Sequence, residues 1–100
     1  MQEREGDIEE LDIANNGISE EAAQDIAQLL LGKPLKKLNV NMNMLCDGGM
    51  YKLAEALKES DTLVELDLGG NNIGPEGGTV LMNSLKRKES LRTLELGCVL

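Results

Sequence analysis

Aromatic residues and histidine are almost absent from this 100-residue chain. It contains no histidine, phenylalanine or tryptophan, and Tyr51 is its one aromatic residue. Without histidine, the chain cannot form a cysteine–histidine nucleophile or a zinc site of mixed cysteine and histidine ligands. A core without large rings must be built from Leu, Ile, Val, Ala and Met, which favours many small, similar layers over one bulky centre.

Cysteine is also scarce, and the two cysteines, Cys46 and Cys98, are too few for a disulfide scaffold. Free thiols in a reducing compartment are the expectation. The glycine-rich stretch GGNNIGPEGG lacks the Gly-Lys-Ser/Thr of a phosphate-binding loop and the spacing of a dinucleotide fingerprint. The sequence therefore predicts no catalytic residue, no metal site and no cofactor, and we do not expect an enzyme.

Positive charge is in deficit, because eighteen acidic residues face ten basic ones and the formal net charge is −8. Such a chain repels phosphate backbones and anionic lipid, so we expect neither nucleic acid nor membrane as the main partner, and instead a protein with a basic surface. No apolar run of membrane-spanning length occurs, and the charged start MQEREGDIEE is unlike a secretion signal. A cytoplasmic location is expected.

One phrase recurs four times at spacings of 27, 28 and 28 residues, beginning at Ile8, Leu35, Leu63 and Leu91. The four copies read IEELDIANN, LKKLNVNMN, LVELDLGGN and LRTLELGCV. Their shared pattern, L-x-x-L-x-L-x-x-N, contains a short period-2 alternation, which predicts a strand with one buried face. The inward positions are Leu11, Ile13, Leu38, Val40, Leu66, Leu68, Leu94 and Leu96.

An asparagine closes the phrase in the first three copies, as Asn16, Asn43 and Asn71. At this point the chain must leave the strand while its backbone is still covered by neighbouring repeats. An asparagine amide can both donate and accept there, so we expect these three residues to be structural.

A helical pattern follows each asparagine, with apolar or small residues at i, i+4, i+5 and i+8. The stripes are Ala22, Ile26, Ala27 and Leu30; Gly49, Leu53, Ala54 and Leu57; and Gly77, Leu81, Met82 and Leu85. Helix starts are expected at Ser19, Asp47 and Pro75, and helix ends at Gly32–Pro34, at Ser60–Asp61 and after Lys86–Lys88. Asn15-Asn16-Gly17 could also form a hairpin turn, but a helical pattern follows it rather than a second strand. The expected fold is an α/β solenoid with parallel strands on the concave face and helices on the convex face.

The repeated phrases, together with segments such as NNIGPEGGTVLMNSL, closely resemble the ribonuclease-inhibitor-like class of leucine-rich repeats. The resemblance covers residues 8 to 100 and implies a single leucine-rich repeat domain over 1–100, with repeats 8–34, 35–62, 63–90 and a partial repeat 91–100. This class includes ribonuclease inhibitor, the sensing ends of NOD-like receptors and Ran GTPase-activating proteins. These proteins share protein binding more than any chemistry.

The fourth repeat departs from the pattern, because Val99 stands where asparagine is expected and no helix follows. Neither end shows an obvious polar cap, which repeat stacks need to shield their terminal layers. We therefore expect the chain to be part of a longer array. The alternative is a short protein that self-associates through its open C-terminal edge, at Leu94, Leu96, Val99 and Leu100.

The outward strand positions form the candidate binding surface of such a stack. They are Glu10, Asp12 and Ala14; Lys37, Asn39 and Asn41; Glu65, Asp67 and Gly69; and Thr93, Glu95 and Gly97. Asp12, Asn39, Asp67 and Glu95 fall into one row, which we call the acidic column. It is either a site for a basic protein or a solvated face with no partner, and the small residues Ala14, Gly69 and Gly97 either admit a partner or relieve crowding.

Three functional classes remain open at this point. The first is a non-catalytic protein-interaction module, and the second is a regulatory or sensor segment of a NOD-like receptor or a GTPase-activating protein. For the second class, Arg4, Arg87 and Arg92 are the only arginines that could act on a phosphate, and none lies in a motif that requires it. The third class is a structural piece of a large assembly.

Overall fold

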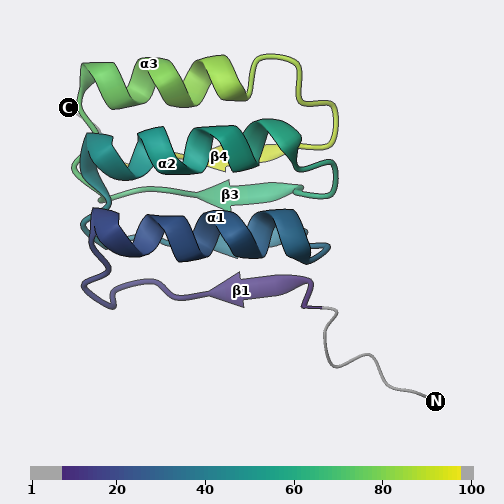
Figure 1. The fold of residues 1–100 in the computed structure, drawn as a ribbon, viewed down its shortest axis with the longest axis horizontal. Helices are drawn as coiled ribbons and strands as arrows, with labels where there is room; N and C mark the ends of the chain where they lie inside the picture. The colour runs from purple at the N-terminus through teal and green to yellow at the C-terminus, as the bar shows by residue number, and fades with distance from the viewer. Residues whose placement is uncertain (1–7, 98–100) are drawn as a thin grey trace.

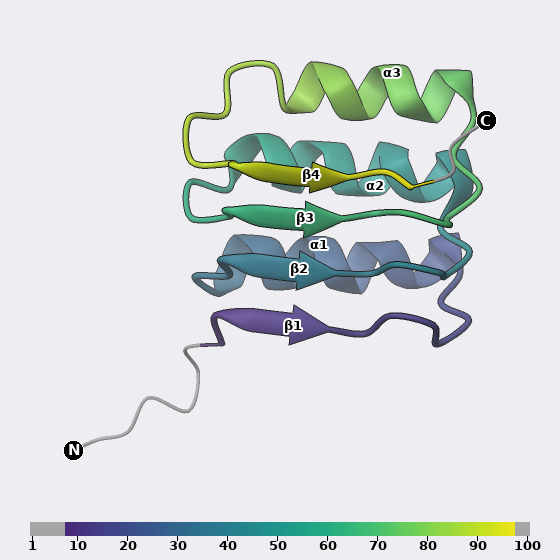
Figure 2. The same cartoon turned by 180° about the vertical axis from the view of Figure 1, so that it is seen from behind.

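The computed structural model describes residues 8–97, so the expectations for Arg4, Cys98, Val99 and Leu100 lie outside the described residues. Four parallel strands lie side by side in chain order, and three helices stack on one face of the sheet (Figures 1 and 2). The elements are β1 (Glu10–Asp12), a 3₁₀ turn η1 (Glu20–Ala22), α1 (Ala23–Gly32), β2 (Lys37–Asn39), α2 (Cys46–Glu59), β3 (Glu65–Asp67), α3 (Pro75–Ser84) and β4 (Thr93–Glu95). The predicted α/β repeat architecture is confirmed.

Strand register matches the repeat phrase position for position. Leu11, Leu38, Leu66 and Leu94 are paired across the sheet, with the outward residues of each strand on either side of them. Because each strand is parallel to the next and in the same register, residues of one type form straight rows across the sheet. These rows place the candidate site.

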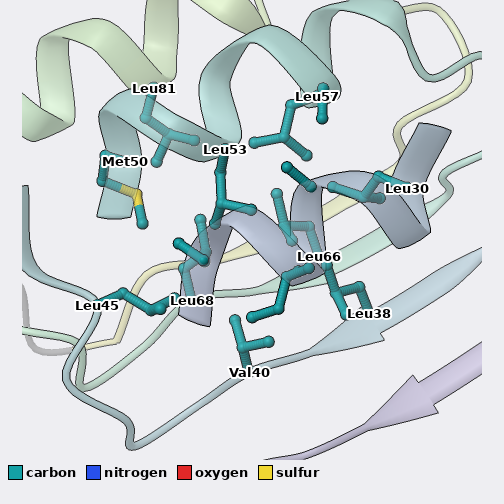
Figure 3. Close-up of a cluster of buried hydrophobic side chains, with 14 of the residues drawn as sticks. Leu30, Leu38, Val40, Leu45, Met50, Leu53, Leu57, Leu66, Leu68 and Leu81 are labelled. Carbon is teal, nitrogen blue, oxygen red and sulfur yellow. The ribbon is translucent and has the colours of Figure 1, made fainter. Parts of the chain in front are cut away.

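The core lies between the sheet and the helices, and it is aliphatic throughout (Figure 3). Leu38 and Leu66 point from the strands toward Leu53 and Leu57 of α2, and Leu81 of α3 closes the layer above them. All five side chains are almost fully buried. Burying one such leucine contributes roughly 1.5–3 kcal/mol, so these layers carry most of the stabilisation.

Asn43 and Asn71 hold the turns that follow β2 and β3, and both are buried. The side-chain oxygen of Asn43 accepts hydrogen bonds from the backbone N–H groups of Asn16 and Ile18, at 2.9 and 3.0 Å. Its amide nitrogen donates to the carbonyls of Val40, at 2.9 Å, and Ile13, at 3.1 Å. One side chain therefore ties its own turn to the turn of the preceding repeat.

Asn71 repeats this arrangement one repeat later. Its oxygen accepts from the backbone N–H of Leu45 at 3.2 Å, and its amide donates to the carbonyls of Val40, Leu68 and Gly69 at 2.9–3.2 Å. Asn16 differs from both, because it is exposed and its amide donates only to the carbonyl of Ala14, two residues away. Among the described residues no repeat precedes the turn at Asn16, so no backbone groups lie there for it to bind.

The first two helix starts differ from the expectation. The Ser19 side chain makes no capping hydrogen bond, and the chain passes through η1 before α1 begins at Ala23. Ala23 is fully buried, whereas the buried position had been expected at Ala22. The second helix begins at Cys46, one residue before Asp47. The third begins at Pro75, as predicted.

Asp47 caps the neighbouring helix rather than its own. Its Oδ1 accepts a hydrogen bond of 2.6 Å from the backbone N–H of Gly74, which precedes α3. Gly77 makes this approach possible, because a Cβ at that position would lie 2.8 Å from the Cα of Asp47. The small residue at Gly77 thus allows α3 to lie close to the start of α2.

The third helix also ends early, at Ser84, so the expectation that it runs to Lys86–Lys88 was wrong. Met82, which we had placed in the buried stripe of that helix, is 49% exposed, whereas Ala27 and Ala54 at the same repeat position are 4% and 8% exposed. Another helix packs beside α1 and beside α2 on the later side of the stack, and no described helix follows α3 (Figure 1). The sequence pattern placed Gly77 and Leu81 correctly on the buried face of α3, but it could not show that Met82 lacks a covering neighbour.

Candidate functional site

The outward face of the sheet is hollowed over all four strands, with a cavity of about 260 Å³. Every outward residue predicted within the strands lines it, together with three of the central leucines: Glu10, Leu11, Asp12, Lys37, Leu38, Asn39, Glu65, Leu66, Asp67, Thr93 and Glu95. Asn41 lies just beyond the end of β2 and is half-buried. The structure thus brings the sequence-predicted partner-binding residues onto one surface.

Charge is partly balanced along the first row of this surface. Lys37 lies between Glu10 and Glu65 in the strand register, and its Nζ is 3.8 Å from a carboxylate oxygen of each. All three side chains are about half-exposed or more, so each ion pair contributes only about 0–1 kcal/mol. Thr93 completes the row without charge. One cation against two carboxylates leaves this row with a single net negative charge.

The acidic column is the second row, and the register places Asp12, Asn39, Asp67 and Glu95 on successive strands. Asn39 separates the first acid from the second, but Asp67 and Glu95 lie on neighbouring strands with no cation between them in the register. Strands are spaced by about 4.8 Å, so two carboxylates on adjacent strands repel each other even when solvated. Uncompensated negative charge therefore concentrates at the β3–β4 end of the hollow.

The column also has a local structural role that the sequence reasoning missed. The side-chain Oδ1 atoms of Asp12, Asn39 and Asp67 each accept a hydrogen bond from the backbone N–H two residues later, at 3.0–3.1 Å. This is an Asx turn, which asparagine and aspartate form equally well. The sequence could have indicated these turns, because this position is aspartate or asparagine in each of the first three repeats.

Asp67 carries a second such contact, because its Oδ1 also accepts from the side-chain amide of Asn41 at 3.2 Å. The other carboxylate oxygen of Asp67 has no hydrogen bond to any residue within 8–97. Asn41 therefore helps to position Asp67.

Gly69 and Gly97 follow the acidic column at positions where the backbone leaves little room for a side chain. A Cβ at Gly97, where φ is +59°, would lie 3.1 Å from the Cα of Gly69, and a Cβ at Gly69 would lie 3.2 Å from the Asn41 amide nitrogen. Of the two explanations left open for Gly69 and Gly97, relief of crowding has this direct support. Ala14 at the same repeat position shows that a methyl group fits on the first strand.

Other chemistry has little basis in residues 8–97. No group of three or more histidine, cysteine, aspartate or glutamate side chains converges there to hold a metal ion. Cys46 is a free, half-buried thiol whose Sγ lies 3.4 Å from the carbonyl oxygen of Met44. No helix in this part of the chain has both the length and the apolar character needed to cross a bilayer.

Known proteins share this repeat pattern. Residues 7–27 and 59–82 match a family model described as "Leucine Rich repeat". RAN GTPase-activating protein 2 of Arabidopsis thaliana is 33% identical over 98 residues, covering 96% of this chain and 18% of that protein. Ribonuclease inhibitor of Sus scrofa is 33% identical over 81 residues, covering 78% of this chain and 18% of the inhibitor. The chain belongs to the leucine-rich repeat family.

A third relative, the NACHT, LRR and PYD domains-containing protein 9 of Bos taurus, is 34% identical over 109 residues and covers 79% of this leucine-rich repeat chain. The chain spans less than a fifth of the length of each of these curated relatives. The resemblance to the ribonuclease-inhibitor-like class is thus supported by relatives of all three kinds expected from the sequence.

Solved structures share the fold of this leucine-rich repeat chain. The tropomodulin C-terminal domain of Caenorhabditis elegans superposes with a TM-score of 0.76 at 26% identity, over 89% of this chain and 56% of that domain. The leiomodin-1 actin-binding site 2 superposes with a TM-score of 0.77 at 20% identity, over 92% of this chain and 56% of that one. At 20% identity the second likeness is one of fold alone.

Proposed function

We propose that this leucine-rich repeat chain is a non-catalytic interaction module that binds a basic surface of a partner protein through its sheet face. The observation that carries the proposal is the uncompensated pair Asp67 and Glu95 on adjacent strands of a hollowed surface. Lys37 already pairs with Glu10 and Glu65, whereas no cation of the described chain pairs with Asp67 or Glu95, so a cation on the partner would gain most at this pair. The repulsion between the two carboxylates would be relieved at the same time.

The free thiol of Cys46 suits a reducing compartment, so an intracellular location is part of the same proposal. The remaining residues of the predicted site have supporting roles. Asp12 extends the negative face to the first strand, and Asn39, Asn41 and Thr93 supply neutral hydrogen-bonding groups.

The test neutralises the acidic column without disturbing its turns. A variant with Asp12→Asn, Asp67→Asn and Glu95→Gln keeps every Asx-turn acceptor, since Asn39 already performs that role in the native chain. The matched control, Glu21→Gln, Asp25→Asn and Glu55→Gln, removes the same three charges from exposed positions on η1 and the helices. Proteins are captured from a cell lysate with each chain, and every captured protein is then measured as a purified partner.

Loss of a basic partner from the column variant alone would support the sheet face as the site. Equal loss from both variants would show that net charge, rather than the column, attracts the partner. Undiminished binding by the column variant would overturn the proposal and move the site to the helical face or the ends of the stack.

We also propose that the chain is one stretch of a longer repeat array, as part of a regulatory or sensor protein or of a large assembly. The exposed position of Met82 on α3 supports this, because the equivalent side chains of the earlier repeats, Ala27 and Ala54, are buried and each lies on a helix with another helix after it. Sedimentation over a range of concentrations tests the alternative. Reversible self-association that is lost in a Met82→Glu variant would favour pairing between copies of this chain over a longer array.

A further inference from the structure

Positive charge gathers at one corner of this acidic protein, where the C-terminal ends of α2 and α3 meet the turn that leads to β4. Four of the nine lysine and arginine residues that the structure describes line the hollows at this corner. We call these four residues, Lys58, Lys86, Arg87 and Lys88, the basic corner. They come from two repeats, and none belongs to the sheet face discussed above.

The corner is hollowed as well as charged. Two cavities of about 410 and 340 Å³ adjoin there and share Asp61, Arg87 and Lys88 in their walls. Asn83 adds a neutral amide to the second cavity. The carboxylates of Asp61 and Glu89 also line the walls, so the four cations outnumber the acids there by two. Lysine, arginine and asparagine side chains are all hydrogen-bond donors, so the cationic part of the wall suits an anionic group that accepts several bonds.

Lys88 has a structural role at this corner, because its ammonium group is already bound by the turn after α2. Its Nζ donates to the backbone carbonyl of Ser60 and lies 4.0 Å from Asp61 Oδ1, and its side chain is only 12% exposed. By contrast, Lys58, Lys86 and Arg87 are exposed and make no ion pair with any other described residue. One cation therefore anchors the turn, and three are available to a ligand.

Two buried hydroxyl groups at this edge of the stack make no hydrogen bond to the described protein, those of Ser60 and Ser90. Ser60 supplies the carbonyl that anchors Lys88, and Ser90 lines the cavity beside Arg87. Buried polar groups without a partner are uncommon in folded proteins, and each calls for an explanation.

The helix macrodipole explains only part of the cluster. Cations are favoured in the last turn of a helix, and Lys58 occupies that place in α2. Lys86 and Arg87 lie beyond the end of α3 at Ser84, because that helix has ten residues where α2 has fourteen. The early end of α3 therefore presents these two cations on a turn, next to Lys58 of the preceding repeat.

We propose that the basic corner binds a short acid-rich segment of a partner protein. A polyanion such as nucleic acid, or an anionic membrane, would be repelled by a chain whose formal net charge is −8. A few clustered carboxylates that reach only the corner avoid that repulsion. This site goes beyond the proposed binding of a basic surface by the sheet face, and the two can fail independently because they share no residue.

The experiment follows backbone amide shifts by NMR at low ionic strength, while a synthetic peptide of alternating glutamate and glycine is added to the whole chain. A peptide of alternating glutamine and glycine and inorganic phosphate are titrated in parallel. The expected result is a saturable set of shifts confined to residues 58–61 and 83–90, caused by the glutamate peptide and weakened by added salt. Shifts spread over all lysines, or equal shifts from inorganic phosphate, would overturn the proposal.

Two variants with opposite expected effects on peptide binding separate an effect on the site from a loss of folding, because a misfolded chain would not bind more tightly. Lys86→Glu with Arg87→Glu should weaken peptide binding by about tenfold, because two attractive charges become repulsive. Asp61→Asn should strengthen it by about two- to threefold, since it removes an acid from the wall of both cavities. Lys52→Glu, on the first half of α2, is the control and should have less than about a twofold effect. Equal weakening by the control, or no gain with Asp61→Asn, would count against the site.

Discussion

Two rows of polar residues cross this repeat stack, and burial separates their roles. Asn43 and Asn71 are buried, and each uses both its amide nitrogen and its oxygen to bind backbone groups of its own and the preceding repeat. The residues of the acidic column are more exposed, and each Oδ1 contact to the backbone reaches only two residues along the chain. A polar row therefore holds repeats together where the neighbouring repeat covers it, and elsewhere remains accessible to a partner.

The largest expected effect separates Asn71 from Asn16. Asn71→Ala leaves the buried N–H of Leu45 and the buried carbonyls near it without their partner, and should lower the free energy of unfolding by about 3 kcal/mol. Asn16→Ala should lower it by less than about 0.5 kcal/mol, because that side chain is exposed. Urea denaturation of both variants measures the difference. Similar losses would mean that position in the phrase, and not burial, decides the role of the asparagine.

A smaller effect is expected within the acidic column. Asp67→Ala removes the acceptor for the Gly69 N–H and for the Asn41 amide, and should cost about 1 kcal/mol. Asp67→Asn keeps the acceptor oxygen and should change the stability by less than about 0.5 kcal/mol, as Asn39 shows on the neighbouring strand. Thermal melts of the pair provide the check. Equal destabilisation of the two variants would mean that the negative charge of Asp67, and not only its acceptor oxygen, stabilises the fold. The charge of the acidic column would then have a structural role besides any role in binding.

The smallest effect concerns an exposed hydrogen bond between repeats, from the Tyr51 hydroxyl on α2 to Glu76 on α3 at 3.1 Å. This bond raises the pKa of Tyr51 above its ordinary value of 10.0, with smaller contributions from desolvation and from the charges of Glu76 and Asp47. The raised pKa means that the folded state favours the neutral phenol. Its small stabilising effect is present below pH 10 and is lost as the pH rises through the raised pKa.

Glu76→Gln should therefore lower the pKa of Tyr51 toward 10.0, and ultraviolet absorbance can follow this directly because the chain has one tyrosine. Glu55→Gln, which removes a charge elsewhere on α2, serves as the control and should leave the titration in place. An unchanged curve in the Glu76 variant would show that the exposed contact between repeats does not persist in solution. The buried asparagines would then be the more important polar link.

The sequence predicted the strands, their inward leucines and the row of outward residues, because a four-fold repeat reports the same alternation four times. It could not predict the exposure of Asn16 and Met82, since both have the right residue type in the right place and lack only a covering neighbour. The capping of α3 by Asp47 was hidden for a related reason. Its partner, Gly74, lies one repeat away, and local helix-start rules assign an acid to its own helix.

The basic corner was not predicted for a different physical reason. Helix ends are set by a competition between propensity and packing, and the pattern of the third repeat predicted a helix to Lys86–Lys88. Once α3 ends at Ser84, the cations belong to a turn, where they lie beside Lys58 rather than along one helix face. An error of a few residues in the predicted end of α3 was therefore enough to miss the basic corner.

Because every strand pairs with the next in the same register, each repeat is held by its neighbours and none is the structural centre of the molecule. Between repeats, the backbone elements lie close only to those of the adjacent repeat: β1 with β2, β2 with β3, β3 with β4, α1 and η1 with α2, and α2 with α3. Excising residues 35–62 would bring β1 beside β3 with the same leucine-to-leucine pairing that each strand has now. The length of such a chain can therefore change by whole units while every remaining joint keeps its shape, and the span of its binding surface changes in equal steps.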